Sequence, residues 1–245
     1  MNRLHYCLGS LFAMVTLYAC SNDPKVKPII PVSAYDVSVW AGKDTSLTIL
    51  DTAVTGIKLT NSNETIAAAK LEGRKILISG VKEGVAVLTL SVLNEERQGG
   101  VTVKVIGLQG VGWRRVDRND KYPLTITIEA TDATFAEQLK KQLTEEILPK
   151  VTEGPANLVF TGANNGTFME GRGSKLVREG NFTFANLKLT LNPAANPEVY
   201  TIVPQSPTSI KLVRDRTEEF KAANPDKGIT LVKVETYWGK INTPG

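Results

Sequence analysis

The feature that most constrains the fold is a series of short runs between positions 32 and 106 in which apolar and polar residues alternate. Successive side chains of a strand point to opposite faces, so this period of two predicts strands with one buried face. The breaks between the runs contain Gly or Asn, such as Gly42, Asn63 and Gly84, which suit tight turns. About seven short strands without a helical pattern predict a small antiparallel β-sandwich.

Two segments of this region resemble a known family. Thr60–Ala67 (TNSNETIA) and Ile76–Ala86 (ILISGVKEGVA) are similar to the turn and strands of the bacterial immunoglobulin-like domain of intimin/invasin-type surface proteins. Val39–Asp44 is similar to the opening strand of that family. The resemblance covers most of residues 35–106. It implies an immunoglobulin-like β-sandwich over residues 32–106 that acts as a spacer or adhesive module without an active site.

Residues 111–245 follow a different pattern. After an alternating strand at Leu124–Ile128, the apolar residues Phe135, Leu139, Leu143 and Ile147 recur every four positions, which predicts a helix over 131–149. Thr134 and Glu137 have capping-box spacing, and Pro149 ends the helix. Alternating strands then return, with a short helix at 217–223 and a last strand at 229–238. We therefore expect two domains and a mainly β protein, in which residues 111–245 form an α+β domain with one long helix on a mainly antiparallel sheet.

This second region weakly resembles the C-terminal half of lipocalin-like lipoproteins of Bacteroidetes. The matching segments are Gly166–Phe168, Gly180–Leu187 and Ile210–Thr217. None of these segments is chemically specific. The resemblance implies a surface lipoprotein that presents a binding domain, and it names no ligand.

The first residues predict export. Arg3 precedes a mostly apolar stretch from Leu4 to Leu17, and Leu17-Tyr18-Ala19-Cys20 follows, which is typical of a secretory signal at residues 1–19. The cysteine at the cleavage point resembles a bacterial lipobox and predicts lipidation of Cys20. Ser21 favours the outer membrane, and the Pro-rich segment 20–31 predicts a lipidated tether. In the alternative interpretation the protein is simply secreted and Cys20 is an ordinary residue.

The composition excludes several kinds of chemistry. The single histidine and both cysteines, His5, Cys7 and Cys20, lie within the first twenty residues. A mature chain without them has no Ser-His-Asp or Cys-His catalytic site, no His- or Cys-ligated zinc and no structural disulfide. No nucleotide-binding, metal-binding or other cofactor motif occurs, so we expect no catalytic residue, metal or cofactor. Acidic and basic residues are interspersed, 29 Lys and Arg against 25 Asp and Glu, which argues against nucleic acid as a partner.

Large and partly polar aromatic residues are the candidate contact residues. We name Trp113, Tyr200 and Tyr237, which suit the recognition of a glycan or a protein surface. Trp238 shares the phase of Val232 and Val234 in the last strand, so we favour Tyr237 over Trp238 as the outward residue. The alternative, which is the more frequent role of such aromatic residues, is packing in the core or at an edge.

One modification site is also predicted. Asp51-Thr52-Ala53 fits the acceptor pattern for O-glycosylation in exported Bacteroidetes proteins, and Thr52 is the candidate residue. A plain turn, in which Asp51 and Thr52 bond the local backbone, is the alternative.

Three functions are therefore open. The first is a non-enzymatic lipoprotein anchored in the outer membrane, with a role in cell adhesion or surface binding to a glycan or a host protein. The second is a carrier or sensor of a small apolar or sugar ligand, which requires a pocket. The third is a hydrolase that uses a carboxylate pair, for which the sequence prefers none of its candidates: Glu170, Glu179, Asp215, Glu218 and Glu219.

Overall fold

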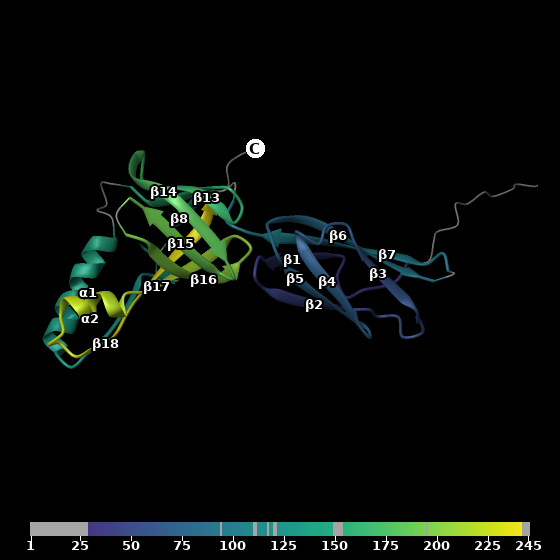
Figure 1. Ribbon diagram of the computed structural model, residues 1–245, viewed down its shortest axis with the longest axis horizontal. Helices are drawn as coiled ribbons and strands as arrows, with labels where there is room; N and C mark the ends of the chain where they lie inside the picture. Colours follow the sequence, from purple (N-terminus) through teal and green to yellow (C-terminus); the bar gives the residue numbers. More distant parts are fainter. Residues whose placement is uncertain are drawn as a thin grey trace, which may run out of the picture.

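The computed structural model describes residues 29–241 except 94, 110–111, 117, 120–121, 149–153 and 195. The described chain is mainly β with two helices, which confirms the predicted fold class at that level (Figure 1). The predicted signal peptide, Cys20 and most of the tether lie outside the described residues. None of the helices in the described part combines the length and the apolar character that a membrane crossing needs.

The strands are β1 (Asp36–Trp40), β2 (Asp44–Thr48), β3 (Ile57–Asn61), β4 (Ala67–Glu72), β5 (Lys75–Gly80), β6 (Gly84–Val92), β7 (Gln98–Ile106), β8 (Gly112–Arg115), β9 (Arg118–Asn119), β10 (Tyr122–Pro123), β11 (Thr125–Ala130), β12 (Ala156–Thr161), β13 (Asn165–Arg172), β14 (Lys175–Ala185), β15 (Lys188–Pro193), β16 (Glu198–Ser206), β17 (Ser209–Asp215) and β18 (Ile229–Ile241). The helices are α1 (Ala133–Ile147) and α2 (Thr217–Ala223).

Strands β1–β7 form two sheets, one with the order β1-β7-β6-β3 and one with the order β2-β5-β4. The alternation predicted from the sequence is visible in their burial, because Ile76, Ile78, Leu88 and Val103 are fully buried and their neighbours along the strands are more exposed. One strand pair differs from the predicted antiparallel sandwich, because β1 runs parallel to β7. The chain leaves β1 for β2 in the other sheet, so no hairpin dictates the direction of β1 beside β7.

Strands β8 and β12–β18 form a closed eight-stranded antiparallel barrel. Each strand from β12 to β18 pairs with the next, and β8 pairs with both β12 and β18. Strand β18 is 13 residues long and has two partners along one edge, β11 over Ile229–Glu235 and β8 over Trp238–Ile241. Closure is a finding beyond the predicted antiparallel sheet, because it depends on a contact between strands that are far apart in the sequence.

The long predicted helix is present as α1, but it begins differently from the capping-box prediction. Asp132 is the N-cap, and its side chain accepts a hydrogen bond from the Phe135 amide at 2.9 Å. Thr134 is therefore already inside the helix, because the carboxylate two residues earlier reaches the free amides of the first turn. Leu139 and Leu143 are buried against the face that β11 and β18 form outside the barrel.

The two groups of strands contact each other directly, and a continuous apolar core joins them. The rings of Trp40 and Trp113 lie 6.2 Å apart. Gly42 has a φ of +81°, and a Cβ there would lie 2.9 Å from the Asn186 Cα in the β14–β15 turn. Glycine at position 42 thus allows both the backbone conformation and the close approach of the two segments.

Candidate functional site

The end of the barrel beside strands β1–β7 is filled with apolar side chains. Phe160 and Phe182 pack edge to face with their ring centroids 5.0 Å apart, and Phe168 and Phe184 are buried beside them. The β14–β15 turn that contacts Gly42 lies at this same end. This half of the barrel is a packed apolar core.

The other end of the barrel holds a cavity of about 230 Å³. Its walls combine the apolar side chains of Leu158, Val177, Leu191, Leu212, Val234 and Trp238 with a set of charged and polar groups. Those groups are Arg115, Glu146, Glu170, Arg172, Arg178, Glu198, Tyr200, Arg214, Arg216 and Thr236. A concave site with an apolar wall and convergent polar groups is the usual form of a small-molecule site in proteins.

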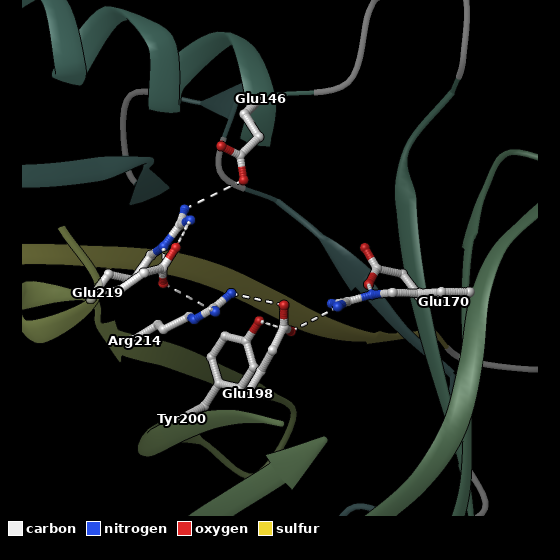
Figure 2. Close-up of polar contacts among 8 residues, drawn as sticks. Glu146, Glu170, Glu198, Tyr200, Arg214 and Glu219 are labelled. Carbon is white, nitrogen blue, oxygen red and sulfur yellow. Dashed lines mark hydrogen bonds and ion pairs between the residues drawn. The ribbon is translucent and has the colours of Figure 1, made fainter. Parts of the chain in front are cut away.

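Glu198, at the start of β16, is the centre of the charged groups (Figure 2). Its Oε1 accepts a hydrogen bond from Arg214 Nη1 at 2.8 Å, and its Oε2 forms an ion pair with Arg178 Nη1, with 2.8 Å between the two atoms. The Tyr200 hydroxyl donates to the same Oε2 at 2.8 Å. Arg178 is held from its other side by Glu170, with 2.6 Å between Nε and Oε2. The Glu198 side chain is only 14% exposed, so these charges interact with little solvent screening.

The pKa values of these groups follow from burial and from their partners. Burial alone would raise the pKa of Glu198, but Arg178, the Tyr200 hydroxyl and Arg214 together hold it below its usual value. Burial alone would lower the pKa of Arg178, but Glu170 and Glu198 raise it. Burial and the adjacent Glu198 carboxylate raise the pKa of Tyr200 to about 12. At neutral pH the site therefore holds an ionised carboxylate, two guanidinium ions and a neutral phenol.

A second group of contacts ties the helices to the mouth of the cavity. Arg216 pairs with Glu219 of α2, with 3.0 Å between Nε and Oε2, and with Glu146 of α1 at 3.4 Å. Arg115 of β8 donates from Nη2 to the Ile147 carbonyl at 2.7 Å. The last turn of α1 has no basic residue of its own, so arginines of other elements supply the positive charge that a helix C-terminus favours.

The structure separates the three predicted contact residues. Trp113 is fully buried, its Nε1 donates to the Leu108 carbonyl at 3.5 Å, and it is a packing residue rather than a surface contact. Tyr200 lines the cavity. Tyr237 is half-buried with the Lys211 ammonium 5.9 Å from its ring centroid, and Trp238 of the opposite strand face lines the cavity instead. Of the predicted three, only Tyr200 belongs to the site.

The predicted modification site lies apart from the cavity. Thr52 is exposed, and Asp51 accepts from the Ala53 amide at 2.9 Å and from Arg97 Nη1 at 3.2 Å. Asp51 therefore stabilises a local turn, as the alternative interpretation expected. Glycosylation of Thr52 stays a prediction. Lipidation of Cys20 also stays a prediction, because Cys20 lies outside the described residues.

The five candidate carboxylates have different positions. Glu170 lines the cavity and Glu219 lies at its mouth, whereas Glu179 is exposed on the outer face of β14. Asp215 accepts from the Thr217 amide and Glu218 pairs with Lys221, which are local contacts at α2. Within the described ranges, no group of three or more potential ligands could hold a metal ion.

Sequence reasoning missed Glu198, Arg178 and Arg214, although a signal for them exists. Arg178 is separated by an even number of positions from the buried Phe182 and Phe184, so its side chain lies on the same face of β14. Arg214 has the same relation to the buried Ile210 and Leu212 in β17. Glu198 and Tyr200 likewise precede the buried Ile202 at a period of two. Charged residues at strand positions whose side chains face the interior indicate a polar interior.

No family model and no curated protein matches the chain. Among solved structures, domains 5–6 of the S-layer protein SbsC match with 14% identity and a TM-score of 0.27, over 64% of this chain and 96% of that chain. A longer crystal structure of SbsC and a structure of its domains 1–6 each match with 14% identity and a TM-score of 0.26, over 66% of this chain and 24% of theirs. At such TM-scores the likeness carries no argument about function.

Proposed function

We propose that this chain is a non-enzymatic binding protein of the cell envelope, whose barrel holds a small polar ligand in the cavity around Glu198. The observation that carries the proposal is the presence of a cavity and a connected charge network in the same half of an otherwise apolar barrel. This favours the second of the functions considered from the sequence, with a polar rather than an apolar site.

The energetics of the network support this function. Buried ion pairs are often no more stabilising than well-packed apolar side chains of similar volume, because the charges lose their hydration. The apolar half of this barrel is packed with Phe160, Phe168 and Phe182, so the fold can bury apolar side chains inside the barrel. Charges retained at the cavity are therefore better explained by binding than by stability.

The same groups argue against acid–base hydrolysis. A general acid at neutral pH needs a carboxyl with a raised pKa. The pKa of Glu198 is lowered instead, since two guanidinium groups and a phenol stabilise its ionised form. An ionised, fully hydrogen-bonded carboxylate positions the arginines beside it and has no proton to donate.

The remaining parts of the proposal concern location. We infer that strands β1–β7 form an immunoglobulin-like domain that acts as a spacer, and that the barrel is a second domain carried by it. Support comes from the four-stranded and three-stranded sheets and from the resemblance of Thr60–Ala67 and Ile76–Ala86. We infer that a lipid anchor on the lipobox-like Cys20, followed by the tether up to residue 31 and this spacer, holds the barrel away from an outer-membrane surface.

A cavity-filling variant tests the binding function. Leu212→Trp adds a large side chain to the cavity wall, and Val199→Trp places the same side chain on the exposed outer face of β16. The wild-type protein and both variants would be purified from their natural host, and the small molecules released on denaturation compared by mass spectrometry. The proposal expects a molecule that is enriched with the wild type and with Val199→Trp but lost from Leu212→Trp. Identical profiles from three folded proteins would contradict it.

A further inference from the structure

We propose that the last turn of α1, residues 144–147, is a lid over the cavity, and that arginine contacts to Glu146 and Ile147 hold it closed. This inference rests on the proposed binding function for its purpose, since a lid controls the entry of a ligand. Its test measures access to the cavity and needs no ligand. The inference follows from the route into the barrel, from the contacts of this turn and from its shallow packing.

The route into the cavity passes the end of the barrel beside the helices. The wall of the barrel is a continuous series of paired strands, from β12 through β18 and back through β8. The end beside strands β1–β7 is filled by buried rings, among them Phe160 and Phe182. Both helices lie at the opposite end of the barrel (Figure 1), where Glu146 and Ile147 line the cavity. A ligand that leaves the sheet and the packed core intact therefore enters past the last turn of α1.

Three arginines from other elements converge on two consecutive residues of this turn. Arg216, which directly precedes α2, pairs through Nη1 with Glu146 Oε1 at 3.4 Å. Arg115 of β8 donates from Nη2 to the Ile147 carbonyl at 2.7 Å. Arg172 of β13 donates from Nη2 to the Glu146 carbonyl at 3.5 Å. All five residues line the cavity, so these contacts hold the end of the helix against the rim of the barrel.

The same turn has little apolar packing. The buried side chains of α1 are Leu139 and Leu143, which pack in the cluster that β11 and β18 form outside the barrel. In the last turn, Ile147 is half-buried and the Glu146 side chain is 54% exposed, so solvent screens its ion pair. Segments with few buried apolar contacts open at a low free-energy cost, while well-packed segments stay folded. The last turn can therefore open while the body of α1 stays in place.

Thiol labelling of a cysteine placed in the cavity measures this opening. The sequence has cysteines only at positions 7 and 20, so replacing both by serine leaves the introduced thiol as the only one in the full chain. Leu212→Cys places the thiol on the cavity wall, and Val199→Cys places it on the exposed outer face of β16. Val234→Cys is a second position on the cavity wall and removes less volume. With iodoacetamide, which is uncharged, we expect the cavity thiols to react roughly tenfold or more slowly than Val199→Cys.

Weakening the contacts of the lid should raise the labelling rate. Glu146→Gln keeps the shape of the side chain and removes the charge that pairs with Arg216. We expect it to make labelling of Leu212→Cys about two- to fivefold faster, the factor that corresponds to one partly exposed ion pair. The matched control is Glu145→Gln, because Glu145 is exposed and is not among the described residues that line the cavity. Labelling at several pH values separates a change in access from a change in the pKa of the thiol.

The urea dependence of labelling separates a lid from a merely structural helix end. Opening of one helical turn exposes little surface, so the labelling rate should change little at low urea concentrations, whereas global unfolding responds steeply.

Three results would overturn the lid. The first is a Leu212→Cys thiol that reacts as fast as the Val199→Cys thiol, because the cavity would then be open already. The second is labelling with the urea dependence of global unfolding. The third is an equal effect of Glu146→Gln and Glu145→Gln, including no effect of either. None of these results bears on whether the cavity holds a ligand, which the cavity-filling comparison decides.

Discussion

Replacing Glu198 by glutamine tests whether the charge network in the barrel is organised as described. The substitution keeps the shape of the side chain and removes its charge, so Arg178 and Arg214 each lose an ionic partner while Tyr200 keeps an oxygen to donate to. Removing one member of a fully buried ion pair costs about 3–5 kcal/mol. Here both arginines retain a second carboxylate, Glu170 and Glu219. We therefore expect a loss of about 1–3 kcal/mol in the free energy of unfolding.

Thermal unfolding measured by circular dichroism at pH 7 would report this loss. For a chain of this size, 1–3 kcal/mol corresponds to a decrease of about 2–12 °C in Tm. The matched control is Glu179→Gln, because Glu179 is exposed on the outer face of the same barrel and its substitution should change Tm by little.

The pH dependence gives a second, sharper criterion. The folded state lowers the pKa of Glu198 below its ordinary value of 4.5, so the stabilisation is present above that pH and is lost as the pH falls through the folded pKa. The difference between wild type and Glu198→Gln should accordingly shrink below pH 4.5. A variant that is as stable as the wild type at pH 7, or a difference that does not change with pH, would refute the network.

Three further predictions use other parts of the molecule. The pKa of Tyr200 is raised to about 12, so the folded state favours its neutral form, and up to about 3 kcal/mol of stability is lost as the pH rises from 10 to 12. Urea unfolding should show this loss for the wild type and not for Tyr200→Phe. Gly42→Ala should lower the free energy of unfolding by more than about 1 kcal/mol. The loss should exceed that of Gly56→Ala, because Gly56 has a similar positive φ but no neighbour within 4 Å. Equal losses would argue against the contact with Asn186. Cys20→Ala should release the protein from the membrane in cell fractionation, whereas a native product that is already soluble would exclude a lipid anchor.

The local elements of this protein were accessible from its sequence because their signals are local. Helix α2 begins and ends where predicted, and the stripe that includes Leu139 and Leu143 identified α1. Apolar periodicity reports which face of an element is buried, and it needs no knowledge of the partner. The same reasoning placed Trp238 on the inward face of β18, where it is 4% exposed.

The choice of functional residues could not be made in this way. Trp113 and Tyr237 were named because they are large and partly polar, but this property does not distinguish a contact residue from a packing residue. The residues that line the cavity include charges in the inward phase of strands, such as Arg178 and Arg214. A sequence shows that such a charge is unusual, but it does not show which opposite charge will meet it.

The sequence by itself determined the mainly β character, the positions of the two described helices and the absence of His and Cys beyond residue 20. Only the tertiary structure decided that β8 meets β18 and closes a barrel. The order β14-β15-β16 in the sheet also puts Arg178 and Glu198 on the same inner face, where they pair although β15 lies between their strands. Strand phase is fixed by neighbouring residues, whereas a contact across a barrel depends on the curvature of all eight strands together.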